Sequence, residues 1–238
     1  LLVFAGTGVV GGTPAGSSRE GVALALVFDT SGSMTESVRD KDGRQTPKYI
    51  IARRALQAVA DRLELFAKSD GAGTRRELSA CLIVFRGGRP REEIEMGPFE
   101  ADRFRKWAAS FGSPAGGTPL GESIRLGAQH VLASPLVRKH ILVITDGMNT
   151  VGADPATVLP GVRKQAEGRQ TVVGFHFVAF DIDAKLFDPV KRLGATVVGA
   201  ADERQLGEQL RTILEQKILL EDEEPVAVPV GATGDKKP

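Results

Sequence analysis

Cysteine is almost absent from this chain of 238 residues, which contains a single one, Cys81. A lone cysteine cannot form an internal disulfide bond, and it cannot build a cysteine-rich metal site. Because Cys81 lies inside the apolar run at 78–85, we expect it to be a buried structural thiol. Cysteine usage therefore excludes a disulfide framework, but it does not identify the cellular compartment.

The chain also lacks an excess of charge of either sign. Its 31 Lys and Arg residues nearly balance 30 Asp and Glu residues, which gives a formal net charge of +1. The arginine pairs at 53–54 and 75–76 are short, and they form no basic stripe of the kind that nucleic acid requires. We therefore expect no nucleic-acid partner. A Walker motif is missing as well, so the chain is not expected to drive a reaction with ATP by itself.

The third missing feature is an apolar run of about 20 residues, the length that is needed to span a bilayer. Residues 1–10 are apolar but too few, and small and polar residues follow them. This pattern is typical of the end of a signal peptide, with cleavage near Ala15, or of a membrane anchor that begins upstream. A strand or a plain leader is the alternative. We predict an extracytoplasmic protein (secreted, periplasmic or membrane-anchored), with the cytoplasm as the alternative location.

The glycines at 6–11 have the spacing of a dinucleotide-binding fingerprint. A real fingerprint opens a helix inside a β-α-β unit. Here Pro14 and small polar residues stand where that helix would begin, so we reject a dinucleotide site. No internal repeat is present.

Apolar residues make up 42% of the chain, enough for a full core, and the length suits one α/β domain with tails. Near-continuous apolar runs alternate with segments in which apolar residues recur every three or four positions. Such runs indicate strands covered on both faces. We predict a doubly wound, mainly parallel central sheet with helices on both faces, a Rossmann-like α/β fold. It spans residues 20–220, between a leader at 1–19 and an acidic, proline-rich linker or tail at 221–238.

The individual elements follow from the same patterns. We expect strands at 21–28, 78–85, 140–145, 171–180 and 195–198. We expect helices from 47 or 48 to 68 and at 98–111, 119–132, 154–167, 188–193 and 201–220. The segment 34–47 is expected to be a loop, 69–74 a turn, and the glycines at 87–88 the end of a strand.

Oxygen-bearing side chains follow the first expected strand. Asp29, Ser31 and Ser33 alternate directly after it, and Gly32 allows the backbone to turn. Hard divalent cations prefer oxygen ligands. In parallel sheets, ligands bind beyond the carboxyl ends of the strands, at a topological switch point. The pattern D-x-S-x-S therefore predicts one part of a site for such a cation.

Two later segments would complete this site. Thr118 offers a hydroxyl in a glycine-containing loop, and Asp146 follows a second apolar strand. Each feature has an ordinary structural explanation. The segment at 29–33 would be a polar turn, Thr118 a helix N-cap before Pro119, and Asp146 part of an Asp-Gly turn. Their occurrence in one chain favours the metal site, and Thr118 would then serve as both cap and ligand.

In this order, D-T-S-G-S, G-G-T-P and I-T-D-G make the chain resemble von Willebrand factor A domains with a metal-ion-dependent adhesion site. The resemblance covers about residues 20–220. It implies that Ser31 and Ser33 ligate the ion directly, and that Asp29 and Asp146 lie close to it and balance its charge. Thr118 would bind the ion directly or through water. Mg²⁺ or Mn²⁺ is the implied ion, with Ca²⁺ as a further option, because all three favour oxygen.

The family is largely non-enzymatic, so the resemblance implies a binding module without catalytic residues. A protein partner would supply a carboxylate that replaces a water on the ion, in adhesion or assembly. Two alternatives stay open: a phosphohydrolase with Asp29 as nucleophile, and a subunit of a cytosolic ATPase-type complex. The first is weakened because Ser31 stands where a second carboxylate is needed. The sequence does not indicate the oligomeric state.

Three further predictions concern the surroundings of the site. We expect residues 34–46 to determine partner specificity, because they leave the motif directly. Asp181 and Asp183 would line the rim or, as we prefer, form a solvated turn. The three histidines (His130, His140 and His176) are interpreted as structural or surface residues.

Overall fold

The computed structural model describes residues 19–68 and 76–220. The predictions for the leader, the glycines at 6–11, the turn at 69–74 and the tail at 221–238 lie outside these residues. Among the helices of the described residues, none has both the length and the apolar character needed to cross a membrane.

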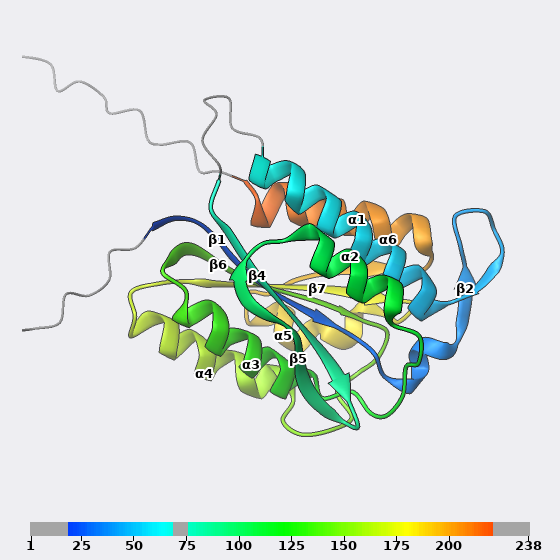
Figure 1. Cartoon of the computed structure of the whole chain (residues 1–238). Helices are drawn as coiled ribbons and strands as arrows, with labels where there is room; N and C mark the ends of the chain where they lie inside the picture. Colours follow the sequence, from blue (N-terminus) through cyan, green and yellow to red (C-terminus); the bar gives the residue numbers. More distant parts are fainter. Residues whose placement is uncertain (1–18, 69–75, 221–238) are drawn as a thin grey trace, which may run out of the picture.

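The core of the fold is a six-stranded sheet with the strand order β5-β4-β1-β6-β7-β8 (Figure 1). All neighbouring strands are parallel except β4 and β5, which are antiparallel. This confirms the predicted mainly parallel sheet. The strands are β1 (Arg19–Phe28), β4 (Leu78–Arg86), β5 (Arg89–Pro98), β6 (Leu136–Thr145), β7 (Val173–Phe180) and β8 (Thr196–Ala200).

Helices cover both faces of this sheet, as predicted for a doubly wound fold. Helices α1, α2 and α6 pack on one face, and α3, α4 and α5 pack on the other (Figure 1). Helix α6 continues into one π-helical turn, η3 (Leu214–Ile218). The helices are α1 (Lys48–Lys68), α2 (Ala101–Ser110), α3 (Leu120–Ala133), α4 (Pro155–Glu167), α5 (Asp188–Arg192) and α6 (Glu203–Ile213), with short 3-10 turns at η1 (Gly32–Thr35) and η2 (Ala184–Phe187).

Strand β1 shows why the sheet is buried on both faces. Successive side chains of a strand point to opposite faces, so Leu24 and Leu26 join the core under α1 while Ala25 joins the core under α3. The small Ala25 allows α3 to approach closely, because a Cβ atom built on Gly127 would lie 3.0 Å from the Cβ of Ala25. Side-chain size therefore sets the distance between α3 and the sheet.

Two parts of the sequence prediction are wrong. Residues 89–98 form the antiparallel edge strand β5, where we expected only the end of a strand and the start of a helix. Gly87 and Gly88 make the tight turn with φ of 59° and 70°. The expected loop at 34–47 contains a small hairpin of β2 (Ser37–Arg39) and β3 (Gln45–Pro47). Both segments are polar, and most of their residues are exposed or half-buried, so they lack the apolar pattern by which strands were identified.

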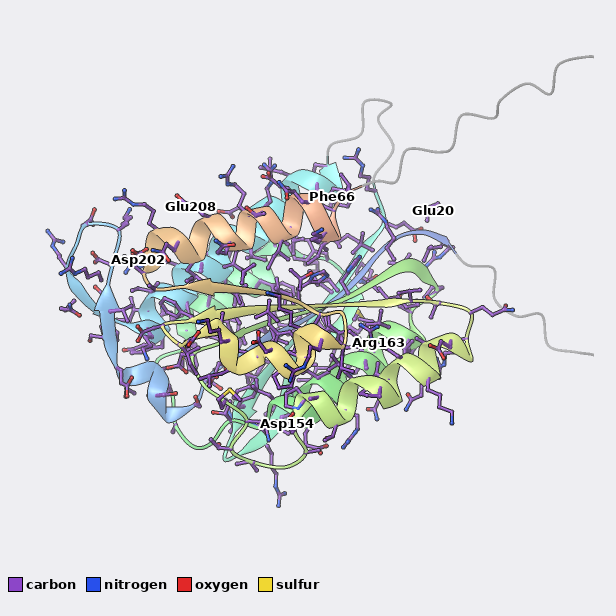
Figure 2. The ribbon with its side chains drawn as sticks, turned by 180° about the vertical axis from the view of Figure 1, so that it is seen from behind. Glu20, Phe66, Asp154, Arg163, Asp202 and Glu208 are labelled. Carbon is purple, nitrogen blue, oxygen red and sulfur yellow. The ribbon has the colours of Figure 1, made fainter. Side chains whose placement is uncertain are left out.

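The order of the strands creates a switch point at the carboxyl ends of β1 and β6. From β1 the chain first moves outward to β4 and β5, and then returns to place β6 on the other side of β1. Figure 2 shows the two ends of the sheet from behind, with Glu20 at the amino end of β1 and Asp202 beyond the carboxyl end of β8. The residues of the predicted site lie at the carboxyl end.

Candidate metal site

Asp29 and Asp146 follow two strands that are direct neighbours in the sheet. Phe28 pairs with Ile144, and the backbone N–H of Asp29 donates to the carbonyl of Ile144 at 3.0 Å. Both carboxylates are buried, Asp29 completely. The parallel register therefore brings together two acidic side chains that are far apart in the sequence.

The predicted hydroxyl groups gather beside Asp146. The hydroxyl oxygens of Ser31 and Ser33 lie 3.1 Å apart, and Ser33 donates to Oδ1 of Asp146 at 2.8 Å. A Cβ atom built on Gly147 would lie 3.6 Å from Oγ1 of Thr118 and 3.8 Å from Oγ of Ser33. The hydroxyl oxygens of Thr118 and Ser33 thus both lie beside the same point above Gly147.

Backbone hydrogen bonds fix the loops that carry these side chains. The N–H of Gly32 donates to the carbonyl of Gly116 at 3.0 Å, and the N–H of Ala115 donates to the carbonyl of Thr30 at 2.9 Å. The hydroxyl of Thr30 donates to the carbonyl of Phe85 at 2.6 Å and accepts from its N–H at 2.9 Å. The first loop is therefore tied both to the Thr118 loop and to the end of β4.

Thr118 is not a helix N-cap, which corrects the sequence prediction. Helix α3 begins at Leu120, Pro119 takes the N-cap position, and no side-chain capping bond forms there. Instead, the backbone N–H of Thr118 donates to the hydroxyl of Thr150 at 2.8 Å, and the N–H of Thr150 donates back to the Thr118 carbonyl at 2.9 Å. The Thr118 hydroxyl makes no hydrogen bond to another described residue, so it remains free for a ligand.

Asp29 is a buried carboxylate that contacts only neutral donors. Its Oδ1 accepts from the N–H of Ser31 at 2.7 Å, and its Oδ2 accepts from the hydroxyl of Thr145 at 2.5 Å. Burial raises the pKa of Asp29 to about 6, the charge of Asp146 adds to this, and the hydrogen bonds from Ser31 and Thr145 oppose it. A cation in this space would relieve the cost of the buried charge.

Asp146 contacts a cation of the chain itself. The ammonium of Lys48, the first residue of α1, lies 3.1 Å from Oδ2 of Asp146. Burial raises the pKa of Asp146, whereas the hydrogen bond from Ser33 and the charge of Lys48 lower it. The pKa of Lys48 is raised despite its burial, because Glu36, Asp181 and Asp146 surround the ammonium. The raised pKa of Lys48 keeps its ammonium charged beside Asp146.

Sequence reasoning missed Thr145 and Lys48. A signal for Lys48 existed, because a cation is unfavourable at the positive N-terminal end of a helix and so indicates acidic neighbours. Asp181 was predicted either to line the rim or, as we preferred, to form a solvated turn. Its side chain is 38% exposed, and its carboxylate also lies 2.9 Å from the Lys48 ammonium at the rim of the site. Asp183 does have a local structural role, since its side chain caps η2.

The histidines and the cysteine lie outside the site. Half-buried His140 on β6 and buried His176 on β7 form a pair with 3.2 Å between ring nitrogens. Burial lowers the pKa of His140 to about 3 and that of His176 to about 4. His130 lies 3.2 Å from Glu92, an acidic neighbour that the sequence did not indicate. Cys81 is fully buried, as expected, and burial raises its pKa.

The donor set fits a hard divalent cation. It combines carboxylate and hydroxyl oxygens, the ligands that Mg²⁺, Mn²⁺ and Ca²⁺ favour. Within the described residues no three or more His, Cys, Asp or Glu side chains gather as a metal site. A metal at this position would therefore depend on the hydroxyls of Ser31, Ser33 and Thr118 as much as on the two carboxylates.

No protein-family model and no curated protein matches the chain. Several solved structures do. The von Willebrand factor type A protein from Catenulispora acidiphila superposes with a TM-score of 0.58 at 15% identity, over 82% of this chain and 42% of that protein. The vWF domain of the type V pili tip protein Mfa5 from Porphyromonas gingivalis gives a TM-score of 0.58 at 12% identity, over 82% of this chain and 94% of that domain. The chain has the fold of a von Willebrand factor A domain.

The same fold occurs in a longer protein. The PilB minor pilin from Streptococcus sanguinis superposes with a TM-score of 0.62 at 16% identity, over 84% of this chain and 62% of the pilin. The chain thus spans less than two thirds of the pilin. At these identities the likeness concerns the fold alone.

Proposed function

We propose that the chain is a protein-binding module that holds Mg²⁺ or Mn²⁺ at Asp29, Ser31, Ser33, Thr118 and Asp146. The bound ion docks an acidic side chain of a partner protein, in adhesion or assembly. The observation that carries the proposal is the convergence of three separate loops, which bring two carboxylates and three hydroxyls to one end of the sheet.

The donor set explains why such an ion would attract an anion. Two carboxylates match the charge of a divalent ion, and the hydroxyls are neutral, so the protein adds no further negative charge to the coordination shell. Magnesium usually keeps several waters in proteins. A partner carboxylate that replaces one of these waters gains a direct contact with the ion, which makes the interaction dependent on the metal.

The alternative of a phosphohydrolase with Asp29 as nucleophile is less well supported. Asp29 is completely buried, and each of its oxygens already accepts a hydrogen bond. A nucleophilic oxygen must form a bond to the substrate itself, whereas Asp29 can hold an ion through one of the waters that magnesium keeps. We therefore propose a binding role for this chain and no catalytic one.

For location we propose the outside of the cell or its surface. The support comes from two proteins of the same fold, which are named as a minor pilin and as the vWF domain of a pilus tip protein. A subunit of a cytosolic ATPase-type complex remains the alternative. Detection of the native protein in cell-surface and cytoplasmic fractions would separate the two.

Metal binding can be tested by calorimetric titration of Mg²⁺ and Mn²⁺ into chelator-treated protein. We expect binding to the wild type and its loss in a Ser31→Ala, Ser33→Ala double variant, which removes two ligands and leaves both carboxylates. Ser110→Ala is the control, because this serine donates only to the carbonyl of Trp107 at the end of α2. Equal binding by the double variant and the wild type would contradict the proposed ligands.

The docking step needs a second measurement. Mn²⁺ bound to the wild type enhances the relaxation of water protons, and an acidic peptide that takes a water position should lower this enhancement. The same peptide with Gln in place of Glu is the control. If the two peptides have equal effects, the ion does not recognise a carboxylate.

A further inference from the structure

Lys48 contacts three carboxylates that come from three different segments. Its ammonium lies 3.1 Å from Asp146 after β6, 2.9 Å from Asp181 after β7 and 2.8 Å from Glu36 in the loop after β1. The Lys48 side chain is only 3% exposed. The ammonium therefore connects the three loops at the rim of the candidate metal site, and it is itself covered from solvent although Glu36 and Asp181 are partly or largely exposed.

The two oxygens of Asp146 are divided between different neighbours. Oδ1 accepts from the hydroxyl of Ser33 at 2.8 Å, on the side of the candidate ligands. Oδ2 accepts from the ammonium of Lys48 at 3.1 Å. As long as this ion pair holds, Asp146 offers only one oxygen to an ion beside Ser33.

The fold maintains this arrangement against one unfavourable local feature. Lys48 is the first residue of α1, where the helix dipole repels a cation. The three carboxylates around the ammonium offset this repulsion.

We propose that Lys48 is a positioning residue that keeps Asp146 a one-oxygen ligand and thereby makes the site prefer Mg²⁺ over Ca²⁺. Magnesium requires nearly octahedral geometry with single oxygens, whereas calcium accepts more ligands and often takes both oxygens of a carboxylate. Holding Oδ2 away from the ion therefore disfavours calcium. This inference rests on the proposed metal-binding function.

The test compares the affinities of the chelator-treated wild type and Lys48→Met for Mg²⁺ and for Ca²⁺ by calorimetry. Methionine has a similar length and no charge, so Asp146 becomes free to present both oxygens. We expect the ratio of Mg²⁺ to Ca²⁺ affinity to fall about tenfold, within the range seen when residues behind metal ligands are changed.

Lys139→Met is the matched control. Lys139 is also buried, but its ammonium donates only to the carbonyls of Ser134 at 2.7 Å and Leu136 at 2.6 Å, near the amino end of β6. This variant loses a buried ammonium without any change at the site. We expect lower stability and an unchanged ratio of affinities.

An unchanged ratio in folded Lys48→Met would overturn the inference. If that variant does not fold, a crystal structure of the wild type with Mn²⁺ decides. If Oδ2 of Asp146 still contacts the Lys48 ammonium in that structure, the inference is supported. If both oxygens of Asp146 bind the ion, the inference is overturned. A wild type that binds no divalent ion would overturn the proposed function together with this inference. A different result would overturn only the role of Lys48: Asp146→Asn abolishes metal binding, but Lys48→Met has the same ratio of Mg²⁺ to Ca²⁺ affinity as the wild type.

Discussion

The hydroxyl of Thr145 donates to Oδ2 of Asp29 at 2.5 Å, from the last residue of β6 to the residue after β1. The same oxygen of Thr145 also accepts from the N–H of Gly147 at 3.2 Å. We expect Thr145→Val, which keeps the shape but removes the hydroxyl, to lower the free energy of unfolding by about 1–3 kcal/mol. The reason is that a buried carboxylate oxygen loses its donor. Urea unfolding at neutral pH measures the effect.

Thr212→Val serves as the control for this prediction. The Thr212 hydroxyl is exposed on α6 and donates to the carbonyl of Glu208. We expect a change within about 0.5 kcal/mol, as for most surface substitutions. Equal effects of the two variants would mean that the contact between Thr145 and Asp29 contributes no more to the free energy of unfolding than an exposed hydroxyl does.

Asp29→Asn should stabilise the metal-free protein. Burial raises the pKa of Asp29 from 3.8 to about 6, so stability is lost as the pH rises through this range and the buried carboxylate ionises. At neutral pH the neutral amide removes a charge penalty of at most about 3 kcal/mol, at 1.4 kcal/mol per pKa unit. The Thr145 hydroxyl can then donate to the carbonyl of Gly147, 3.0 Å away, and accept from the amide. We expect a higher midpoint of urea unfolding with chelator, and no further gain when Mg²⁺ is added.

Asp146→Asn provides the contrast for this prediction. Asp146 is paired with the ammonium of Lys48, so its loss leaves a buried cation with one partner fewer. We expect this variant to be less stable than the wild type with chelator. If Asp29→Asn is destabilised to the same extent, the charge of Asp29 is not a cost of the fold.

The partly buried pair of His140 and His176 should make the protein less stable in mild acid. Burial lowers the pKa values from 6.5 to about 3 and about 4, so below pH 6.5 the unfolded chain takes up protons that the folded protein does not. Stability from the neutral pair is therefore present above pH 6.5 and is lost as the pH falls toward 4. The slope is at most about 1.4 kcal/mol per pH unit for each histidine.

A double variant, His140→Leu with His176→Leu, isolates this effect from other titrating groups. The difference in unfolding free energy between wild type and variant, measured by urea unfolding from pH 7 to pH 4, should change in favour of the variant as the pH falls. Parallel pH profiles for the two proteins would contradict the assignment of this pH dependence to the histidine pair.

Gly121 and Gly207 should respond in opposite ways to alanine. A Cβ atom on Gly121 would meet the backbone of Ala153, whereas a Cβ atom on Gly207 would meet nothing within 4 Å. We expect Gly121→Ala to cost about 1–3 kcal/mol or more, because the start of α3 must move. Gly207→Ala, inside α6, should add about 1 kcal/mol from helix propensity. The measurement is thermal unfolding of both variants. If Gly121→Ala is as stable as the wild type, the backbone at Ala153 can move away at little cost in free energy.

The sequence allowed prediction of those parts of the molecule that local patterns encode. β1 is a nearly continuous apolar run, and Asp29 follows it directly, so both the strand and the position of the carboxylate at its end could be inferred. The parallel sheet then followed from the alternation of strands and helices. The convergence of Asp29 and Asp146 could be predicted for the same reason, since both follow buried strands of one sheet.

Features that depend on distant contacts could not be predicted. β5 has the sequence RPREEIEMGP, in which only Ile94 is fully buried, so the strand exists because β4 pairs with it. Lys48 lies 98 positions from Asp146, and no local pattern links them. Thr118 fitted the sequence pattern of an N-cap. In the structure its backbone is hydrogen-bonded to Thr150, and α3 begins at Leu120 with Pro119 in the N-cap position.

The two edges of the sheet have a consequence for how this protein can associate. β5 carries charged side chains along its length and a proline at its second and its last position, and β8 is only 5 residues long. Charges, prolines and short length at an edge strand oppose pairing with a strand of another chain. The sheet is thus protected against growth by strand addition at both sides. Under the proposed function, contacts with a partner would fall to the loops at its carboxyl end, and copies held close together would not join edge to edge.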